Sequence, residues 1–238
     1  PQAIQVMLDP ADCGPATIAM SQDVQAEAYD YPEIFFEEKI HEIRRSHPDL
    51  NQIQAAAEKI KSSKQPIIIS GGGVLYSEAE QELSDFAKKH NIPVTSTVMG
   101  LGCMDNDDPY YIGNIGGLGD KSSNNLSKDT DLALAVGTKL ADFTTGSWSN
   151  FENKDFKLVS INTARYDVSK HRSTPVISDA KIAFQELSEA LGDWKAPDIW
   201  FERAVKERLE WKNYVEKQSG PTNQELPSYA HAVGAVYR

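Results

Sequence analysis

Hydrophobic residues in the middle of the chain gather in short runs separated by segments with a helical period. Each short apolar run is bounded by turn residues, and this pattern predicts buried strands at 65–70, 92–97, 132–136, 157–162 and 175–177. Between these runs, apolar residues recur every three or four positions. That period predicts helices at 49–63, 77–90, 122–128 and 179–191, with Ser77 and Glu80 forming a capping box at the start of the second.

Strands that alternate with helices indicate crossover connections and a parallel sheet. Strands that are apolar throughout, as in Pro-Ile-Ile-Ile at 66–69, are typical of a sheet covered on both faces. We therefore predict an α/β unit over residues 48–192: a Rossmann-like parallel sheet of five to six strands with helices on both faces.

The two flanks have different patterns. Residues 14–20 are predicted to form the last strand of a preceding domain, followed by an acidic connector whose aromatic residues pack it onto its neighbours (Tyr29, Tyr31, Phe35 and Phe36). A charged helix is predicted at 196–218, and a further helical pattern covers 226–238. Since the sequence opens at Pro1 with what resembles the end of a domain, we expect it to be a piece of a longer protein.

The composition excludes several classes of function. The chain has 238 residues and a net charge of −11, which opposes nucleic-acid binding because no basic patch is available to displace counterions. The longest apolar runs are the length of strands, so no membrane span is expected. Cys13 and Cys103 lack metal-ligand spacing and are predicted to be reduced thiols of a cytoplasmic protein.

Glycine clusters are the main candidates for ligand binding. Gly71–Gly73 lies between a strand and a helix, where backbone N–H groups can approach a phosphate. Its spacing matches neither the dinucleotide fingerprint nor a P-loop, so a tight structural turn is the alternative. Two more clusters, at 100–102 and 113–119, are expected at the carboxyl ends of strands, where ligands bind such sheets.

No other motif identifies catalytic or metal-binding residues. Asp105–Asp108 lacks the glycine and the distal glutamate of a calcium loop and is predicted to be a solvated acidic loop. The five histidines stand in no recognisable metal or catalytic pattern, and no nucleophile elbow is present. The sequence therefore predicts no catalytic residue and no metal ligand.

Three segments resemble thiamine-diphosphate enzymes: Gly-Pro-Ala-Thr-Ile-Ala through Gln-Asp-Val-Gln at 14–25, Gly-Gly-Gly-Val-Leu-Tyr-Ser-Glu-Ala at 71–79, and 136–146. The stretch Ala-Glu-Ala-Tyr-Asp-Tyr-Pro at 26–32 resembles one branch, the C–C hydrolases that open a cyclic trihydroxycyclohexanedione to 5-deoxyglucuronate in myo-inositol breakdown. The resemblance implies thiamine diphosphate and Mg²⁺ in the full-length enzyme. It implies neither in this chain, because the chain has no Gly-Asp-Gly: Gly-Asp-Lys at 119–121 and Gly-Asp-Trp at 192–194 do not fit that motif.

The resemblance also implies a division into domains. Residues 1–47 would be the end of the pyrimidine-binding domain plus a linker, 48–192 the central domain, and 193–238 a helical linker toward the diphosphate-binding domain. The full-length enzyme would be a cytoplasmic homo-oligomer acting on a small cyclic dione, and this piece alone would be inactive.

Related enzymes hold flavin or an adenine nucleotide in this central domain. The resemblance implies a corresponding crevice here, as a vestige of a nucleotide site, at Gly72, Gly73, Thr97, Gly137 and Asp142. Leu101 stands where many members have lysine, which removes a cation from the crevice. Two alternatives stay open: an acetolactate-synthase-like carboligase, which 100–102 and 142–146 also resemble, and a free-standing FAD- or NAD-binding module.

Overall fold

A computed structural model describes all residues from 1 to 238. The strands are β1 (Pro66–Ser70), β2 (Val94–Ser96), β3 (Tyr111–Asn114), β4 (Leu132–Val136), β5 (Lys157–Asn162) and β6 (Thr174–Ile177). The α-helices are α1 (Gln2–Met7), α2 (Leu50–Lys61), α3 (Gly72–Tyr76), α4 (Glu80–His90), α5 (Lys121–Asp129), α6 (Asp142–Thr145), α7 (Arg165–Val168), α8 (Ala180–Leu191), α9 (Asp198–Ser219) and α10 (Tyr229–Tyr237). Short 3₁₀ turns cover Val24–Ala26, Glu33–Phe36, Val98–Gly100 and Lys170–Arg172.

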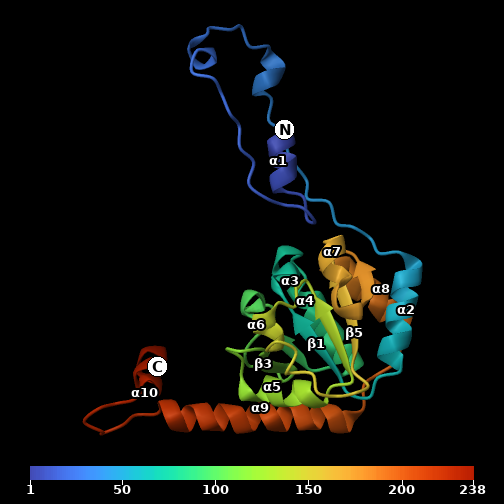
Figure 1. The fold of residues 1–238 in the computed structure, drawn as a ribbon, viewed down its shortest axis with the longest axis vertical. Helices are drawn as coiled ribbons and strands as arrows, with labels where there is room; N and C mark the ends of the chain where they lie inside the picture. The colour runs from blue at the N-terminus through green and yellow to red at the C-terminus, as the bar shows by residue number, and fades with distance from the viewer.

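All six strands form one sheet in the order β3-β2-β1-β4-β5-β6 (Figure 1), and every neighbouring pair is parallel. The order reverses between β1 and β4, which places the topological switch point at the carboxyl ends of those two strands. The predicted fold class is confirmed. The strand missing from the prediction is β3, whose short apolar stretch Tyr110–Ile112 is followed at once by Gly113.

Side chains on each strand alternate between two hydrophobic cores, one on each face of the sheet. Ile68 and Leu134 pack against α2, α4 and α8, whereas Ile67, Ala133 and Ala135 face α5 and α9. Because both faces are covered, the central strands β4 (Leu-Ala-Leu-Ala-Val) and β1 (Pro-Ile-Ile-Ile-Ser) are apolar at every position but Ser70, as the sequence pattern indicated.

The helix boundaries follow local capping chemistry. Asp49 caps α2 by accepting a hydrogen bond from the N–H of Asn51, and Asp179 caps α8 through Lys181. The predicted capping box at Ser77 is wrong: α4 begins only after Ala79, and buried Ser77 instead accepts a hydrogen bond from the N–H of Ala180. The Ser77 hydroxyl therefore binds the start of α8 instead of capping α4, because α3 and α8 pack together.

The long helix α9 packs across one face of the domain at its first half (Figure 1). Trp200 and Ala204 are buried against β1 and α5, and the Trp200 indole donates a hydrogen bond to the carbonyl of Pro66 at 2.8 Å. One turn further, Arg208 binds Asp120 at 2.9 Å. The C-terminal part of the helix extends beyond the sheet, and α10 packs on it at Ser219, where Gly234 leaves no room for a side chain.

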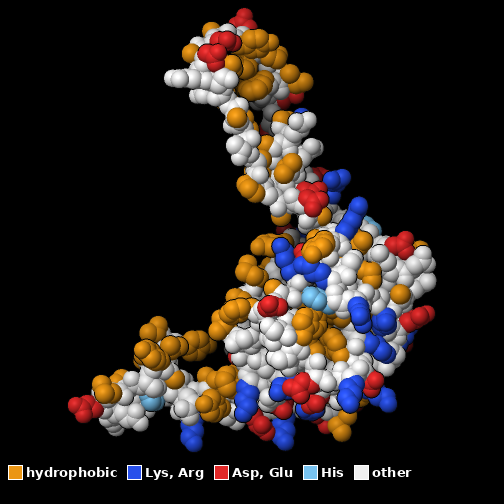
Figure 2. Space-filling view, viewed as in Figure 1, with side chains coloured by type: hydrophobic (Ala, Val, Ile, Leu, Met, Phe, Trp, Pro, Cys, Tyr) orange, Lys and Arg blue, Asp and Glu red, His pale blue; other side chains and the backbone are white.

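Residues 1–44 form an N-terminal arm that extends away from the sheet (Figure 1). The strand predicted at 14–20 does not form, because no neighbouring strand offers hydrogen bonds to it. The connector's aromatic residues pack on one another rather than on the domain, with Phe35 and Phe36 at a ring distance of 5.4 Å, and they remain largely exposed (Figure 2). The prediction that they pack the connector onto its neighbours is therefore wrong for this chain.

No helix of this chain combines the length and the apolar character that crossing a bilayer requires.

His90, at the end of α4, makes the stability of the domain depend on pH. The imidazole is fully buried, Nδ1 donates a hydrogen bond to the carbonyl of Trp194 at 2.8 Å, and Nε2 lies 3.3 Å from the Ser188 hydroxyl. Burial lowers the pKa of His90 below its ordinary value, opposed in part by the bond to Trp194. The unfolded chain therefore takes up this proton first as the pH falls.

We expect the free energy of unfolding to decrease as the pH drops below about 6.5, the ordinary histidine pKa, toward the lower pKa of folded His90. Urea unfolding at about pH 7.5 and about pH 5.5 measures this loss. His90→Gln should reduce the difference between the two conditions, whereas His41→Gln, on the N-terminal arm, should leave it unchanged. An equal pH dependence in the wild type and His90→Gln would contradict the assignment.

Candidate functional site

The loops that follow β1, β2, β3 and β4 meet at the carboxyl edge of the sheet, and all three glycine clusters lie in them. This is the position expected from the sequence and the edge at which parallel sheets bind ligands. The structure brings three of the candidate residues together beside the switch point: Gly72, Gly73 and Gly137. Thr97 lies next to them, since its N–H binds the carbonyl of Ser70, at the end of β1.

Gly71 and Gly73 contact the loop after β4 through their backbones. The Gly71 N–H donates to the carbonyl of Val136 at 2.8 Å, and the Gly73 N–H donates to the carbonyl of Gly137 at 3.0 Å. A Cβ on Gly71 would lie 2.3 Å from the Gly137 oxygen, and one on Gly73 would lie 2.5 Å from the Gly137 Cα. Both positions therefore require glycine, because the backbone of Gly137 occupies the space that a Cβ would need.

The loop after β2 is joined to β1 in the same way. The Thr97 N–H donates to the carbonyl of Ser70 at 2.9 Å, and a Cβ on Gly100 would lie 2.3 Å from that same oxygen. Gly72 has slightly more room, since its nearest neighbour would be the Met99 carbonyl at 3.1 Å. The backbone of β1 is thus enclosed at its carboxyl end by the loops on both sides.

Asp142, the fifth candidate, is exposed at the start of α6. Its charge acts on His171, whose pKa is lowered by burial and by Lys170, with Asp142 opposing the shift. The next residue, Phe143, accepts a hydrogen bond from the Gly117 N–H at 2.8 Å. The loops after β3 and β4 are therefore also tied together.

The acidic residues of the chain offer no metal centre. No group of three or more His, Cys, Asp or Glu side chains is placed to hold an ion. Asp107 pairs with Lys212 and Asp108 with Lys88, each at 3.0 Å, so the acidic loop is occupied by surface ion pairs. The carboxylate of Asp120, in the sequence Gly-Asp-Lys, binds the Arg208 guanidinium.

Cys103 is buried beneath the β1 loop, and its thiol donates to the carbonyl of Gly71 at 3.6 Å. Burial raises the pKa of this thiol to about 11, so it is protonated at neutral pH. Because the thiolate is the reactive form, we expect Cys103 to react slowly in the folded chain. Cys13, in contrast, is exposed on the N-terminal arm.

We expect a thiol reagent such as Ellman's reagent to modify only Cys13 in the native protein and both cysteines after denaturation. Cys13→Ser should remove the reaction of the folded chain. Rapid modification of Cys103 in native Cys13→Ser would show that the loop above it opens.

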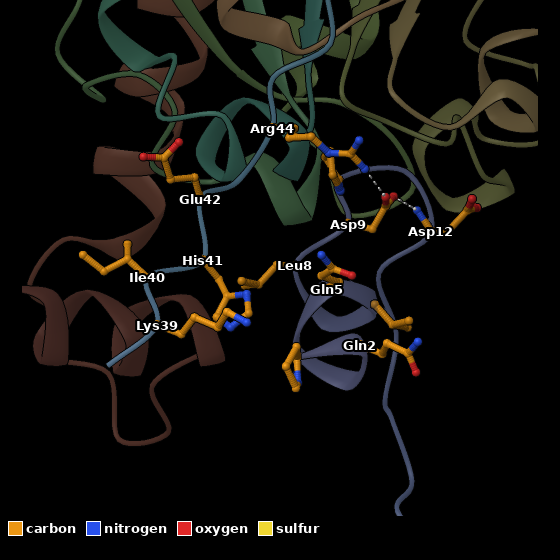
Figure 3. Close-up of a pocket in the computed structure, with 13 residues that line it drawn as sticks. Gln2, Gln5, Leu8, Asp9, Asp12, Lys39, Ile40, His41, Glu42 and Arg44 are labelled. Carbon is orange, nitrogen blue, oxygen red and sulfur yellow. Dashed lines mark hydrogen bonds and ion pairs between the residues drawn. The ribbon is translucent and has the colours of Figure 1, made fainter. Parts of the chain in front are cut away.

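A hollow of about 900 Å³ lies elsewhere, between α1 and residues 39–44 of the N-terminal arm (Figure 3). Its lining mixes cations with carboxylates, including Arg44 and Asp9, which face each other at 3.7 Å. Arg44 is largely exposed. Because opposite charges line a solvent-open surface, the hollow presents no defined charge to a ligand.

Comparison with known proteins identifies the family. The profile described as "Thiamine pyrophosphate enzyme, central domain" matches residues 53–187, from α2 into α8. The chain belongs to the thiamine pyrophosphate enzyme family. The matched range coincides with the six-stranded sheet and its covering helices, so the family resemblance and the Rossmann-like fold are both confirmed.

Three similar members of this family are named 3D-(3,5/4)-trihydroxycyclohexane-1,2-dione hydrolase. The protein from Geobacillus thermodenitrificans is 37% identical over 98% of this chain and 38% of its own length. That from Clostridium perfringens is 38% identical over 90% of this chain and 34% of its own length. The protein from Bacillus anthracis is 35% identical over 98% of this chain and 38% of its own length. The chain thus spans 34–38% of the length of these relatives.

Sequence reasoning located the glycines of this thiamine pyrophosphate enzyme domain but not their contacts. Which carbonyl each N–H meets depends on the approach of segments far apart in the sequence, such as Gly73 and Gly137, which are 64 residues apart. The sequence analysis also did not predict the ion pair between Arg208 and Asp120. The spacing of Trp200, Ala204 and Arg208 at every fourth position could have indicated that this side of the helix faces the domain.

Proposed function

We propose that this chain is the central domain of a thiamine-diphosphate-dependent hydrolase that opens the ring of 3D-(3,5/4)-trihydroxycyclohexane-1,2-dione to 5-deoxyglucuronate. The observation that carries the proposal is the match of 90–98% of the chain to relatives of that name at 35–38% identity. The match includes the flanks of the domain as well as the sheet, since it extends well beyond residues 53–187.

The same observation weighs against the alternatives. A free-standing FAD or NAD module and an acetolactate-synthase-like carboligase share the fold, and fold alone does not separate them from a hydrolase. The relatives similar over nearly the whole chain are named as the dione hydrolase, so neither alternative is favoured.

Residues 1–238 do not fit the site for thiamine diphosphate and Mg²⁺. A diphosphate-bound Mg²⁺ needs oxygen ligands in octahedral geometry, and this chain has no cluster of acidic side chains to supply them. Asp120, the best match by sequence, is held by Arg208 and also accepts from the Asn114 N–H. We therefore assign no step of the reaction to this chain, and we propose that the rest of the enzyme binds cofactor and substrate.

The finer features of the full-length enzyme belong to the same proposal. They are a Mg²⁺-bound cofactor, a role in myo-inositol breakdown, a cytoplasmic location and a homo-oligomeric assembly. We also propose the domain division at residues 47 and 192. The first half of α9 packs on the central domain, so the helical linker of 193–238 would be anchored before it leaves the domain.

The test uses the longer polypeptide that contains residues 1–238, supplied with thiamine diphosphate and Mg²⁺. Nuclear magnetic resonance should show conversion of the cyclic dione to 5-deoxyglucuronate, with no acetolactate formed from pyruvate. Acetolactate formation with no reaction of the dione would instead support the carboligase.

A further inference from the structure

Five glycines at the carboxyl edge share one property: a Cβ on any of them would lie within 2.5 Å of a backbone atom of a neighbouring segment of the chain. We call them the glycine cluster (Gly71, Gly73, Gly100, Gly116 and Gly137). We propose that the glycine cluster closes the switch point of the sheet by backbone-to-backbone packing, and that this chain therefore does not hold the diphosphate of a flavin or adenine nucleotide there.

The first support is that two of the three glycine N–H groups of the turn, those of Gly71 and Gly73, are already used, which leaves only the Gly72 N–H without a partner within the protein. A phosphate at the start of a helix is bound by backbone N–H groups that lack a partner within the protein. Here the N–H groups of Gly71 and Gly73 donate to the carbonyls of Val136 and Gly137. A diphosphate at this turn would have to displace both bonds and would meet two carbonyl oxygens, which repel an anion.

The second support is that protein backbone fills the space beside the glycines. In a dinucleotide-binding turn, the missing side chain lets the pyrophosphate approach the backbone. In this chain the Gly137 backbone occupies that space at Gly71 and Gly73, and the Ser70 carbonyl occupies it at Gly100. The same arrangement recurs at Gly116, which meets the carbonyl of Phe143. The contacts join the loops after four neighbouring strands.

The third support is the weak attraction for an anion. The helix that begins at Gly72 has only five residues, so few aligned peptide dipoles point at the turn. Lys139 is the only Lys or Arg within two residues of the glycine cluster, and it is exposed.

The first experiment titrates the purified chain with FAD, and separately with ADP, by calorimetry and by flavin fluorescence. We expect no saturable binding up to about 1 mM of either compound. Stoichiometric binding at micromolar concentration would overturn the proposal, whatever the activity of the longer enzyme.

The second experiment compares Gly73→Ala with Gly117→Ala. The Cβ added at Gly73 would collide with Gly137, whereas at Gly117 the nearest atoms lie at 3.9–4.0 Å, an ordinary contact distance. We expect Gly73→Ala to lower the melting temperature by at least about 5 °C and Gly117→Ala to change it by no more than about 2 °C. A Gly73→Ala chain as stable as the wild type would overturn the proposal, because it would show that the loops are not held in contact.

Discussion

Replacing Trp200 by alanine is expected to destabilise the domain by about 3–5 kcal/mol, which is a large part of the stability of a typical domain. The indole is buried between α9 and the sheet, and its N–H donates to the first carbonyl of β1. Alanine would leave a cavity between α9 and Ile67 and would leave the Pro66 carbonyl without its partner. Urea or thermal unfolding followed by circular dichroism measures the loss.

Trp211→Ala is the matched control, because Trp211 lies on the same helix beyond the part that packs on the sheet. Its ring is only partly buried and stacks on Tyr214. We expect this change to cost less than about 1 kcal/mol. Equal losses for the two tryptophans would mean that α9 does not use its first half as an anchor.

Asp179→Ala should have the next largest effect, a loss of about 2.5 kcal/mol. This carboxylate caps α8 through the Lys181 N–H and also binds the guanidinium of Arg45 at 3.0 Å. Asp179 is almost fully buried and Arg45 is about a quarter exposed, so removal of the carboxylate leaves a poorly solvated cation with only Glu78 nearby. Chemical denaturation of the variant checks the value.

The control for this change is Asp49→Ala, which removes the cap of α2 at an exposed position with no arginine partner. A cap alone is worth about 1 kcal/mol. If both variants lost the same amount, the ion pair between Arg45 and Asp179 would contribute nothing to the free energy of unfolding.

The sheet could be predicted from the sequence because its strands are apolar on both faces and its longer helices have a clear period. Elements without those signals were missed or misplaced. β3 has four residues and contains Gly113, so it offers little pattern. It forms because β2 provides a partner, and Thr95 donates to the Gly113 carbonyl at 2.7 Å. The strand at 14–20 failed for the opposite reason, since no strand in this chain pairs with it.

At the candidate site, the sequence could place the glycines at the carboxyl edge. It could not show whether these positions are glycine because a ligand approaches them or because another backbone segment does. A glycine is needed whenever something approaches the main chain closely, and the sequence is the same in both cases. Only the distance from Gly73 to Gly137 shows that the approaching group is protein.

Isothermal titration of residues 1–238 with thiamine diphosphate in the presence of Mg²⁺ tests the central claim most directly, namely that this chain is a structural domain without a catalytic site of its own. The account predicts no saturable heat, because the chain has no acidic cluster for the metal and its net charge of −11 repels a diphosphate. Micromolar binding of the cofactor by this chain alone would contradict it.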